Sequence, residues 1–303
     1  MFVEGVMIAQ RVGRGNARYD AALMSTESTL STFVASDGDN LAIQDWPLDL
    51  GRTLRGVVLL VHGLGEHAGR YEHVARRLNN WGFAVRGHDQ FGHGESGGPR
   101  GGLPTDTRLL DDLADIVDST RSRMRDDTPL ILLGHSLGGL VAARFVSLAL
   151  RPIDGLILSS PALDPGLNVF QKLLVALLPG VAPNLRVGNG LDPNFLSHDP
   201  KVVAAYRADR LVHDRISARL ARFIADGGAA TLALASQWRV PTLLLYAGAD
   251  KLVNPAGSRA FATAAPKDTV SAHCFEPLFH EIFNELDAEP VFAALKAWLD
   301  EHY

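Results

Sequence analysis

A serine stands between glycines in GHSLGG (134–139), directly after the apolar run PLILL (129–133) and before the helical pattern LVAARFVSLAL (140–150). The pattern G-x-S-x-G between a strand and a helix is typical of a nucleophile elbow, a sharp turn that exposes the serine hydroxyl above a sheet. A tight turn without chemistry is the structural alternative, because glycines also let elements pack closely. The chemistry that an elbow implies is attack of Ser136 on a carbonyl carbon.

A serine hydroxyl needs a histidine base and an acid that orients it, and in this arrangement the chain order is Ser, Asp or Glu, then His. Asp250 follows the apolar run LLLYAG, and His280 follows the next predicted strand, within FHEIFNE. Both are therefore expected at the sheet edge that carries Ser136, unless Asp250 caps a helix and His280 lies on the surface. Asp268 and His273 are weaker candidates, because one precedes that next strand and the other lies within it.

The attack also needs N–H donors for the oxyanion that forms. One is expected to be the backbone N–H of Leu137, at the start of the helix, where the helix dipole also favours negative charge. The second is expected from Leu64 in HGLGEHAGRY (62–71), where Gly63 and Gly65 supply backbone freedom. The alternative is a glycine turn that leads into the next helix.

Short apolar runs alternate with amphipathic helical patterns, which predicts an α/β fold with a mostly parallel sheet covered on both faces. In such a sheet, functional groups gather beyond the carboxyl ends of the strands, where the candidates above lie. Eight strands are expected at 28–36, 40–48, 56–63, 83–89, 129–134, 154–160, 240–248 and 268–276. Helices are expected at 71–82, 105–124, 137–150, 255–265 and 288–302.

Residues 161–228 interrupt the alternation and contain helical patterns of their own, at 168–180, 199–211 and 216–224. Such a long insertion in a compact domain is typical of a functional lid, so a helical cap is expected here. The first of these helices is rich in leucine. These apolar residues either form a surface for a lipid or a membrane, or pack onto the core. They are Leu173, Leu174, Val175, Leu177 and Leu178.

Composition excludes several other classes of protein. The net charge of 29 − 34 = −5, without a basic block, argues against nucleic-acid binding. His62, His67 and His73 lack the spacing of metal ligands, and no phosphate-binding loop is present, so neither metal nor cofactor is expected. The single cysteine, Cys274, fits a reducing compartment. With no recognisable signal peptide and no membrane span, a cytoplasmic protein is expected, peripheral to membranes if the cap contacts them.

Five motifs together resemble the α/β-hydrolase superfamily, and within it the monoacylglycerol lipase and lysophospholipase-like branch, which is often labelled serine aminopeptidase. They are HGLGEHAGRY, DQFGHGES, GHSLGG, GAD and FHEIFNE, and the resemblance covers about residues 27–300. It implies an α/β-hydrolase core at 27–160 and 229–303, with 161–228 as a cap over an acyl-chain tunnel. Residues 1–26 fall outside it and are expected to be an extension that lacks order.

By this resemblance Ser136, Asp250 and His280 form a catalytic triad, with Leu64 and Leu137 as the oxyanion hole. The cap departs from the family pattern in one place, because Asp209-Arg210-Leu211 stands where Asp-Pro-Leu is usual. That departure concerns the substrate and leaves the chemistry untouched.

The predicted reaction is ester hydrolysis through an acyl-enzyme, on an ester with one acyl chain such as a monoacylglycerol. A short-chain carboxylesterase is the nearest alternative. A serine aminopeptidase is another, and would need a carboxylate to bind an ammonium group. A non-catalytic receptor on a hydrolase scaffold is disfavoured, because all the catalytic groups are present. The carboxylates available in the cap are Asp192, Asp199, Asp209 and Asp214.

Overall fold

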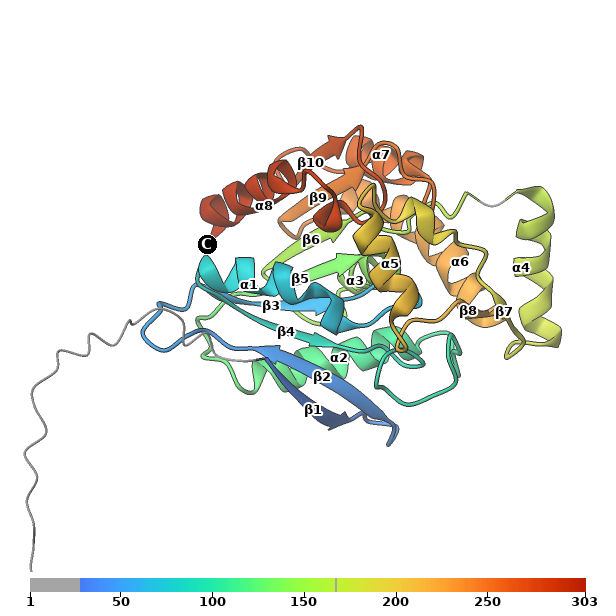
Figure 1. Ribbon diagram of the computed structural model, residues 1–303, viewed down its shortest axis with the longest axis horizontal. Coiled ribbons are helices and arrows are strands. Elements are labelled where there is room, and N and C mark those ends of the chain that lie inside the picture. Colours follow the sequence, from blue (N-terminus) through green and yellow to red (C-terminus); the bar gives the residue numbers. More distant parts are fainter. Residues whose placement is uncertain (1–27, 167) are drawn as a thin grey trace, which may run out of the picture.

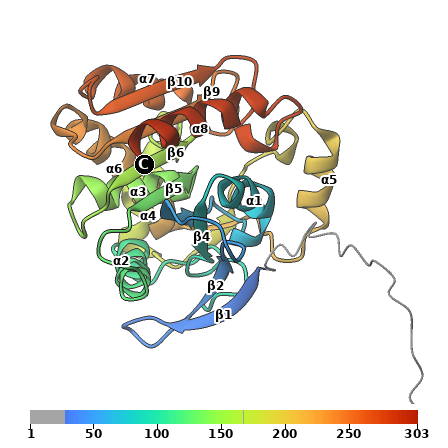
Figure 2. The ribbon, with the colours of Figure 1, turned by 90° about the vertical axis from the view of Figure 1, so that its left-hand side faces the viewer.

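The computed structural model describes residues 28–166 and 168–303, so the expected N-terminal extension, 1–26, lies outside the described residues. Eight strands form one twisted sheet in the order β1-β2-β4-β3-β5-β6-β9-β10. The β1–β2 hairpin lies at one end of the sheet and β10 at the other (Figure 2). The strands are β1 (Thr29–Val34), β2 (Asn40–Trp46), β3 (Gly56–Val61), β4 (Phe83–His88), β5 (Leu130–His135), β6 (Gly155–Ser159), β9 (Thr242–Ala247) and β10 (Val270–Phe275).

From β4 to β10 along the sheet every neighbouring pair of strands is parallel, and the antiparallel pairs of this sheet are β1–β2 and β2–β4. Every residue of β3, β5, β6 and β9 is buried, as the continuous apolar runs predict for strands covered on both faces. The predicted α/β-hydrolase fold and its eight strands are confirmed. All parallel strands point the same way, so their carboxyl ends form one edge for the site.

Helices cover both faces of this sheet (Figure 1). Two of them, α1 and α8, share a buried core with one face, and α2, α3, α6 and α7 share a second core with the other. The core helices are α1 (Glu72–Asn80), α2 (Arg108–Arg121), α3 (Leu137–Ser147), α6 (Ala218–Leu234), α7 (Pro255–Ala264) and α8 (Glu289–His302). Each element predicted outside the insertion is present, with ends shifted by a few residues.

The insertion between β6 and β9 contains two further helices, α4 (Val169–Val181) and α5 (Pro200–Ala208). It also contains a small two-stranded antiparallel sheet of β7 (Arg186–Gly188) and β8 (Arg215–Ser217). Figure 1 shows α4 standing at the outer end of the molecule, beside α6. Leu173, Leu174 and Leu177 are 54%, 44% and 62% exposed, so these leucines do not pack onto the core. No helix in the described part of the chain is long and apolar enough to cross a membrane.

The last helix of the insertion, α6, crosses the expected cap boundary at residue 228. Its Gly228 lies against the backbone after β6, where an added Cβ would stand 2.4 Å from the carbonyl oxygen of Leu163. Only glycine permits this contact, so the second half of α6 packs as part of the core. One continuous helix therefore links the insertion to the core, and the domain division itself stays a prediction.

Candidate active site

Ser136 lies on a strained turn between β5 and α3. Its φ of 53° and ψ of −118° are unusual for any residue other than glycine, and such strain is stored mainly at functional sites. The glycines around it are required by space. A Cβ at Gly138 would stand 2.0 Å from the carbonyl oxygen of Val61, and one at Gly134 would stand 2.4 Å from that of Gly138. The GHSLGG motif thus folds with the geometry of a nucleophile elbow.

The structure brings Asp250 and His280 together. Asp250 follows β9, His280 follows β10, and the Nδ1 atom of His280 lies 2.6 Å from Oδ2 of Asp250. The other oxygen, Oδ1, accepts hydrogen bonds from the backbone N–H groups of Leu252 (2.8 Å) and Val253 (3.0 Å), which orient the carboxylate. Nδ1 is engaged in this way, so Nε2 is the ring nitrogen left to exchange a proton with a substrate or nucleophile.

The two alternative residues do not share this arrangement. Asp268 lies before β10, at the end of the strand away from the site, and His273 is an exposed residue within this edge strand. Asp250 and His280 therefore lie beyond the carboxyl ends of their strands, as predicted, and Asp268 and His273 do not. What Asp250 and His280 do remains a proposal, made below.

Opposing effects set the pKa of His280, which is only 4% exposed. Burial disfavours the charged imidazolium, but the Asp250 carboxylate, with Glu281 and Glu66 farther away, outweighs burial and raises the pKa. His135 shows the opposite result. Burial and the nearby His280, whose ring centroid is 4.8 Å away, lower the pKa of His135 to about 4. Of these two rings, His280 is therefore the one that gains a proton first as the pH falls.

The loop after β3 carries Leu64, the predicted oxyanion donor. Beside it, Gly65 has a φ of 77°, and an added Cβ would stand 2.3 Å from the carbonyl oxygen of His213 in the insertion. The backbone N–H of His213 donates to the carbonyl oxygen of Gly65 (2.9 Å), so the insertion holds this loop directly. Leu137 is the first residue of α3, where backbone N–H groups have no acceptor within the helix.

A buried charge cluster supports the same loop. Glu66, 3% exposed, accepts hydrogen bonds from the backbone N–H of Gly63 (2.6 Å) and the hydroxyl of Tyr71 (2.5 Å), and pairs with Arg70. Arg70 also donates to both carboxylate oxygens of Glu281, at 2.7 and 2.9 Å, next to His280. These residues lie in HGLGEHAGRY and FHEIFNE, but the spacing within either motif does not indicate that their charged side chains pair with one another.

This charge cluster predicts that the stability of the folded protein falls in acid. Burial disfavours the Glu66 carboxylate, but Arg70 and His135 outweigh it and lower the pKa from 4.5 to about 2. Because the pKa is lower in the folded state, the ionised carboxylate stabilises the folded protein above pH 4.5. This stabilisation is lost progressively as the pH falls through 2. As the pH falls from 5 to 3, protonation of Glu66 is expected to lower the free energy of unfolding by about 2 kcal/mol, measured by unfolding in urea.

Glu66→Gln should lack this part of the pH dependence, while Glu301→Gln, a change at an exposed position of α8, should keep it. Equal pH dependence in wild type and Glu66→Gln would contradict the assignment.

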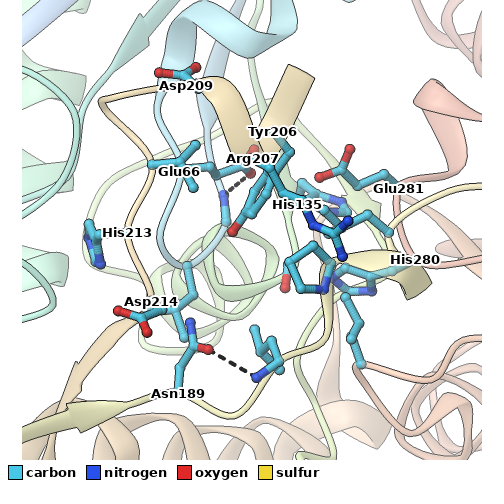
Figure 3. Close-up of a pocket in the computed structure, with 18 residues that line it drawn as sticks. Glu66, His135, Asn189, Tyr206, Arg207, Asp209, His213, Asp214, His280 and Glu281 are labelled. Carbon is cyan, nitrogen blue, oxygen red and sulfur yellow. Dashed lines mark hydrogen bonds between the residues drawn. The ribbon is translucent and has the colours of Figure 1, made fainter. Parts of the chain in front are cut away.

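Two cavities meet at Ser136 and His280, which line both of them. The first, the polar cavity, has a volume of about 290 Å³ and is lined by many polar side chains. Figure 3 shows Asp209, His213 and Asp214 on one side of it and His280 and Glu281 on the other. The second, the apolar cavity, has a volume of about 140 Å³ and is lined mainly by apolar side chains. Its apolar lining residues are Leu64, Leu137, Ala162, Pro165, Val175, Leu191, Ile216, Ala221, Ile224, Leu252 and Val253.

The three histidines weighed as metal ligands have separate protein partners. The Nε2 atom of His62 accepts from the backbone N–H of Gln90 (2.9 Å), and Nε2 of His67 lies 2.8 Å from Asp209. Nε2 of His73 lies 3.1 Å from the carbonyl oxygen of Phe283. Across residues 28–166 and 168–303, no group of three or more His, Cys, Asp or Glu side chains could hold a metal ion.

The comparison with known proteins agrees with this geometry. Residues 52–287 match the protein family described as serine aminopeptidase, S33. The chain belongs to the S33 serine aminopeptidase family. It is 32% identical to a monoacylglycerol lipase of Mycolicibacterium smegmatis, covering 92% of this chain and 100% of that protein.

Other relatives of this S33-family protein are also lipid-cleaving enzymes by name. It is 32% identical to the phospholipase YtpA of Bacillus subtilis, over 81% of this chain and 95% of that protein. The crystal structure of a monoacylglycerol lipase from Paleococcus ferrophilus matches with a TM-score of 0.76 and 34% identity, covering 91% of this chain and 100% of that one. The S33-family chain is therefore a serine hydrolase of the lipase and esterase type.

Proposed function

We propose that this hydrolase cleaves esters of one medium or long acyl chain with an uncharged alcohol, such as a monoacylglycerol. The observation that carries the proposal is the position of Ser136 and His280 where a polar cavity meets an apolar one. An ester carbonyl at that junction would place its acyl chain among apolar side chains and its alcohol among polar ones.

In the proposed mechanism, Nε2 of His280 takes the proton of Ser136 as its oxygen attacks the ester carbonyl carbon. The N–H groups of Leu64 and Leu137 hold the resulting oxyanion, and Asp250 stabilises the imidazolium. His280 then gives the proton to the leaving alcohol, which forms the acyl-enzyme. Water, deprotonated by His280, attacks the acyl-enzyme carbonyl, and the acid leaves as Ser136 regains its proton.

The charges around the polar cavity favour an uncharged alcohol over the ammonium group of a peptide. Of its carboxylates, Glu66 and Glu281 share Arg70, and Asp209 pairs with His67. Asp214 lies 3.2 Å from the guanidinium of Arg215. Each of these carboxylates already has a hydrogen-bond or ion-pair partner in the protein, which the ammonium group of a peptide would have to replace. This requirement disfavours the aminopeptidase reaction.

The two remaining candidate carboxylates act as helix caps. Asp192 accepts from the backbone N–H of Asn194, and Asp199 from that of Lys201, at the start of α5. Neither lines the polar cavity. Two curated relatives, the M. smegmatis lipase and the B. subtilis phospholipase, carry names that also support a lipid ester as substrate.

The proposal includes residues 161–228 as a cap over the site and α4 as its contact with a lipid surface. Support comes from Leu173, Leu174 and Leu177, whose side chains are exposed at the outer end of the molecule, where α4 lies (Figure 1). Val175 of the same helix lines the apolar cavity, so α4 would face the lipid on one side and the acyl chain on the other. The proposal includes no cofactor, metal or nucleic acid.

A substrate series tests the function. Monoacylglycerols of increasing chain length should show kcat/KM rising by about 4-fold per methylene, the equivalent of about 0.8 kcal/mol, until the apolar cavity is filled. An aminoacyl amide should show no turnover above that of Ser136→Ala. Activity that is highest with the shortest acyl chain would favour a short-chain carboxylesterase instead, and turnover of the amide would favour an aminopeptidase.

A further inference from the structure

His280 lies on a loop beyond the edge strand β10, and both of its chain neighbours are held by hydrogen bonds. The backbone N–H of Phe279 donates to Oε1 of Glu285 (2.7 Å). On the other side, the backbone N–H of Glu281 donates to the carbonyl oxygen of Leu196 in the insertion (2.8 Å). The backbone on either side of His280 is therefore attached to groups outside the 279–281 turn.

Glu285 makes the first of these attachments and also binds the insertion. Its side chain is only 1% exposed. The backbone N–H of His198 donates to Oε2 (3.1 Å), and Nδ1 of the same residue lies 2.8 Å from Oε1. The imidazole of His198 also stacks on the ring of Phe279, with centroids 3.7 Å apart. One carboxylate thus joins the loop of His280 to the segment before α5.

That segment is itself firmly placed. The hydroxyl of Ser197 donates to the carbonyl oxygen of Asn284 (2.8 Å) and accepts from the backbone N–H of Asp199 (2.9 Å). Asp199 caps α5, so the start of this helix and the turn that carries His280 form one hydrogen-bonded unit. The Asp250–His280 contact alone would orient the ring but would leave the turn's backbone free to shift.

We propose that Glu285 is a positioning residue, which fixes the backbone beside His280 so that its ring stays aligned between Asp250 and Ser136. This inference rests on the proposed role of His280 as the base. Burial of a carboxylate is costly unless it is hydrogen-bonded, and here its two oxygens accept hydrogen bonds from two separate segments, among them those from the backbone N–H groups of Phe279 and His198. A neutral amide at this place would offer only one oxygen to them.

Two substitutions at position 285 test the inference. In Glu285→Ala both attachments of the carboxylate are lost, and kcat for a p-nitrophenyl ester should fall by about 10- to 100-fold, since a misplacement of about 1 Å has effects of this size. Glu285→Gln retains one acceptor and should show a smaller fall in kcat. KM should stay within about 2-fold of wild type in both, because Glu285 lines neither cavity that meets at Ser136.

The proton resonance of His280 Nδ1–H reports alignment directly, since this group faces Asp250 at 2.6 Å. It should broaden or move upfield in both variants. Glu289→Gln is the matched control, because Glu289 is an exposed glutamate on α8 that pairs with Arg77. It should keep both kcat and the resonance.

Each outcome is decisive. Wild-type kcat and an unshifted resonance in folded Glu285→Ala would overturn the positioning role, as would a rise in KM at constant kcat. If Glu285→Ala does not fold, the same two measurements on Glu285→Gln decide. Failure of the proposed function appears differently, as a wild-type protein that does not hydrolyse esters at all.

Discussion

Replacing Ser136 with alanine is expected to lower kcat for any ester on the order of 10⁶-fold, because the attacking oxygen is removed. The fold should not change. Alanine has the same Cβ as serine at the strained φ of 53°, and within the described residues the hydroxyl makes no hydrogen bond that supports a neighbouring element. Steady-state hydrolysis of a p-nitrophenyl ester and the thermal midpoint of unfolding measure the two effects. Labelling by a fluorophosphonate should disappear together with the activity.

Ser160 provides a matched control, because it is another serine with a positive φ (41°) at the end of a strand, and it is buried. Its hydroxyl oxygen has no hydrogen-bond partner in the part of the chain that the structure describes, and Ser160 lines neither cavity at Ser136. Ser160→Ala should keep wild-type activity and labelling. Normal esterase activity in Ser136→Ala would overturn the proposed mechanism, and a wild-type protein without labelling would favour a non-catalytic receptor.

Replacing Asp250 with asparagine is expected to lower kcat on the order of 10⁴-fold while leaving Ser136 in place. An amide in contact with Nδ1 stabilises the wrong tautomer of His280 and cannot stabilise its cation. The remaining activity should also change its pH dependence. Burial lowers the pKa of His280, and Asp250 is the main group that raises it.

Hydrolysis needs neutral His280, whose fraction grows as the pH rises through its pKa. In wild type the pKa lies above 6.5, so the acid limb of kcat/KM should have its midpoint above that value. In Asp250→Asn the limb should move to lower pH. Asp268→Asn, at the exposed alternative position, should keep both rate and midpoint. An unchanged limb in Asp250→Asn would mean that another group governs the titration.

Much of the candidate site could be predicted from local patterns. Ser136, Asp250 and His280 each follow an apolar run of strand length, and parallel strands in a covered sheet end at one edge. Leu64 and Leu137 follow from the same rule, because each comes directly after a strand and beside glycines. Periodicity and chain order therefore predict these five residues at one edge of the sheet. In the structure, four of them line the two cavities and Asp250 contacts His280, while their roles stay a prediction.

The groups that hold this site in place could not be predicted in that way. Arg70 and Glu281 are 211 positions apart in the chain, and His198 and Glu285 are 87 apart. Charged side chains at such separations pair only because the packing of the elements between them brings them together. The motifs that contain Arg70, Glu281 and Glu285 can be recognised in the sequence, but no periodicity indicates which carboxylate faces which donor.

The exposure of α4 was left open for a similar reason. The sequence pattern of an apolar helix is the same whether its leucines face the core or the solvent. Only the placement of α4 beside α6 shows that Leu173, Leu174 and Leu177 are exposed. The sequence by itself determined the fold class and the residues at the strand ends, because hydrophobic periodicity and chain order are local properties. The tertiary structure alone decided the charge pairs, the attachment of the insertion and the two cavities, because these depend on side chains that meet only after the chain has folded.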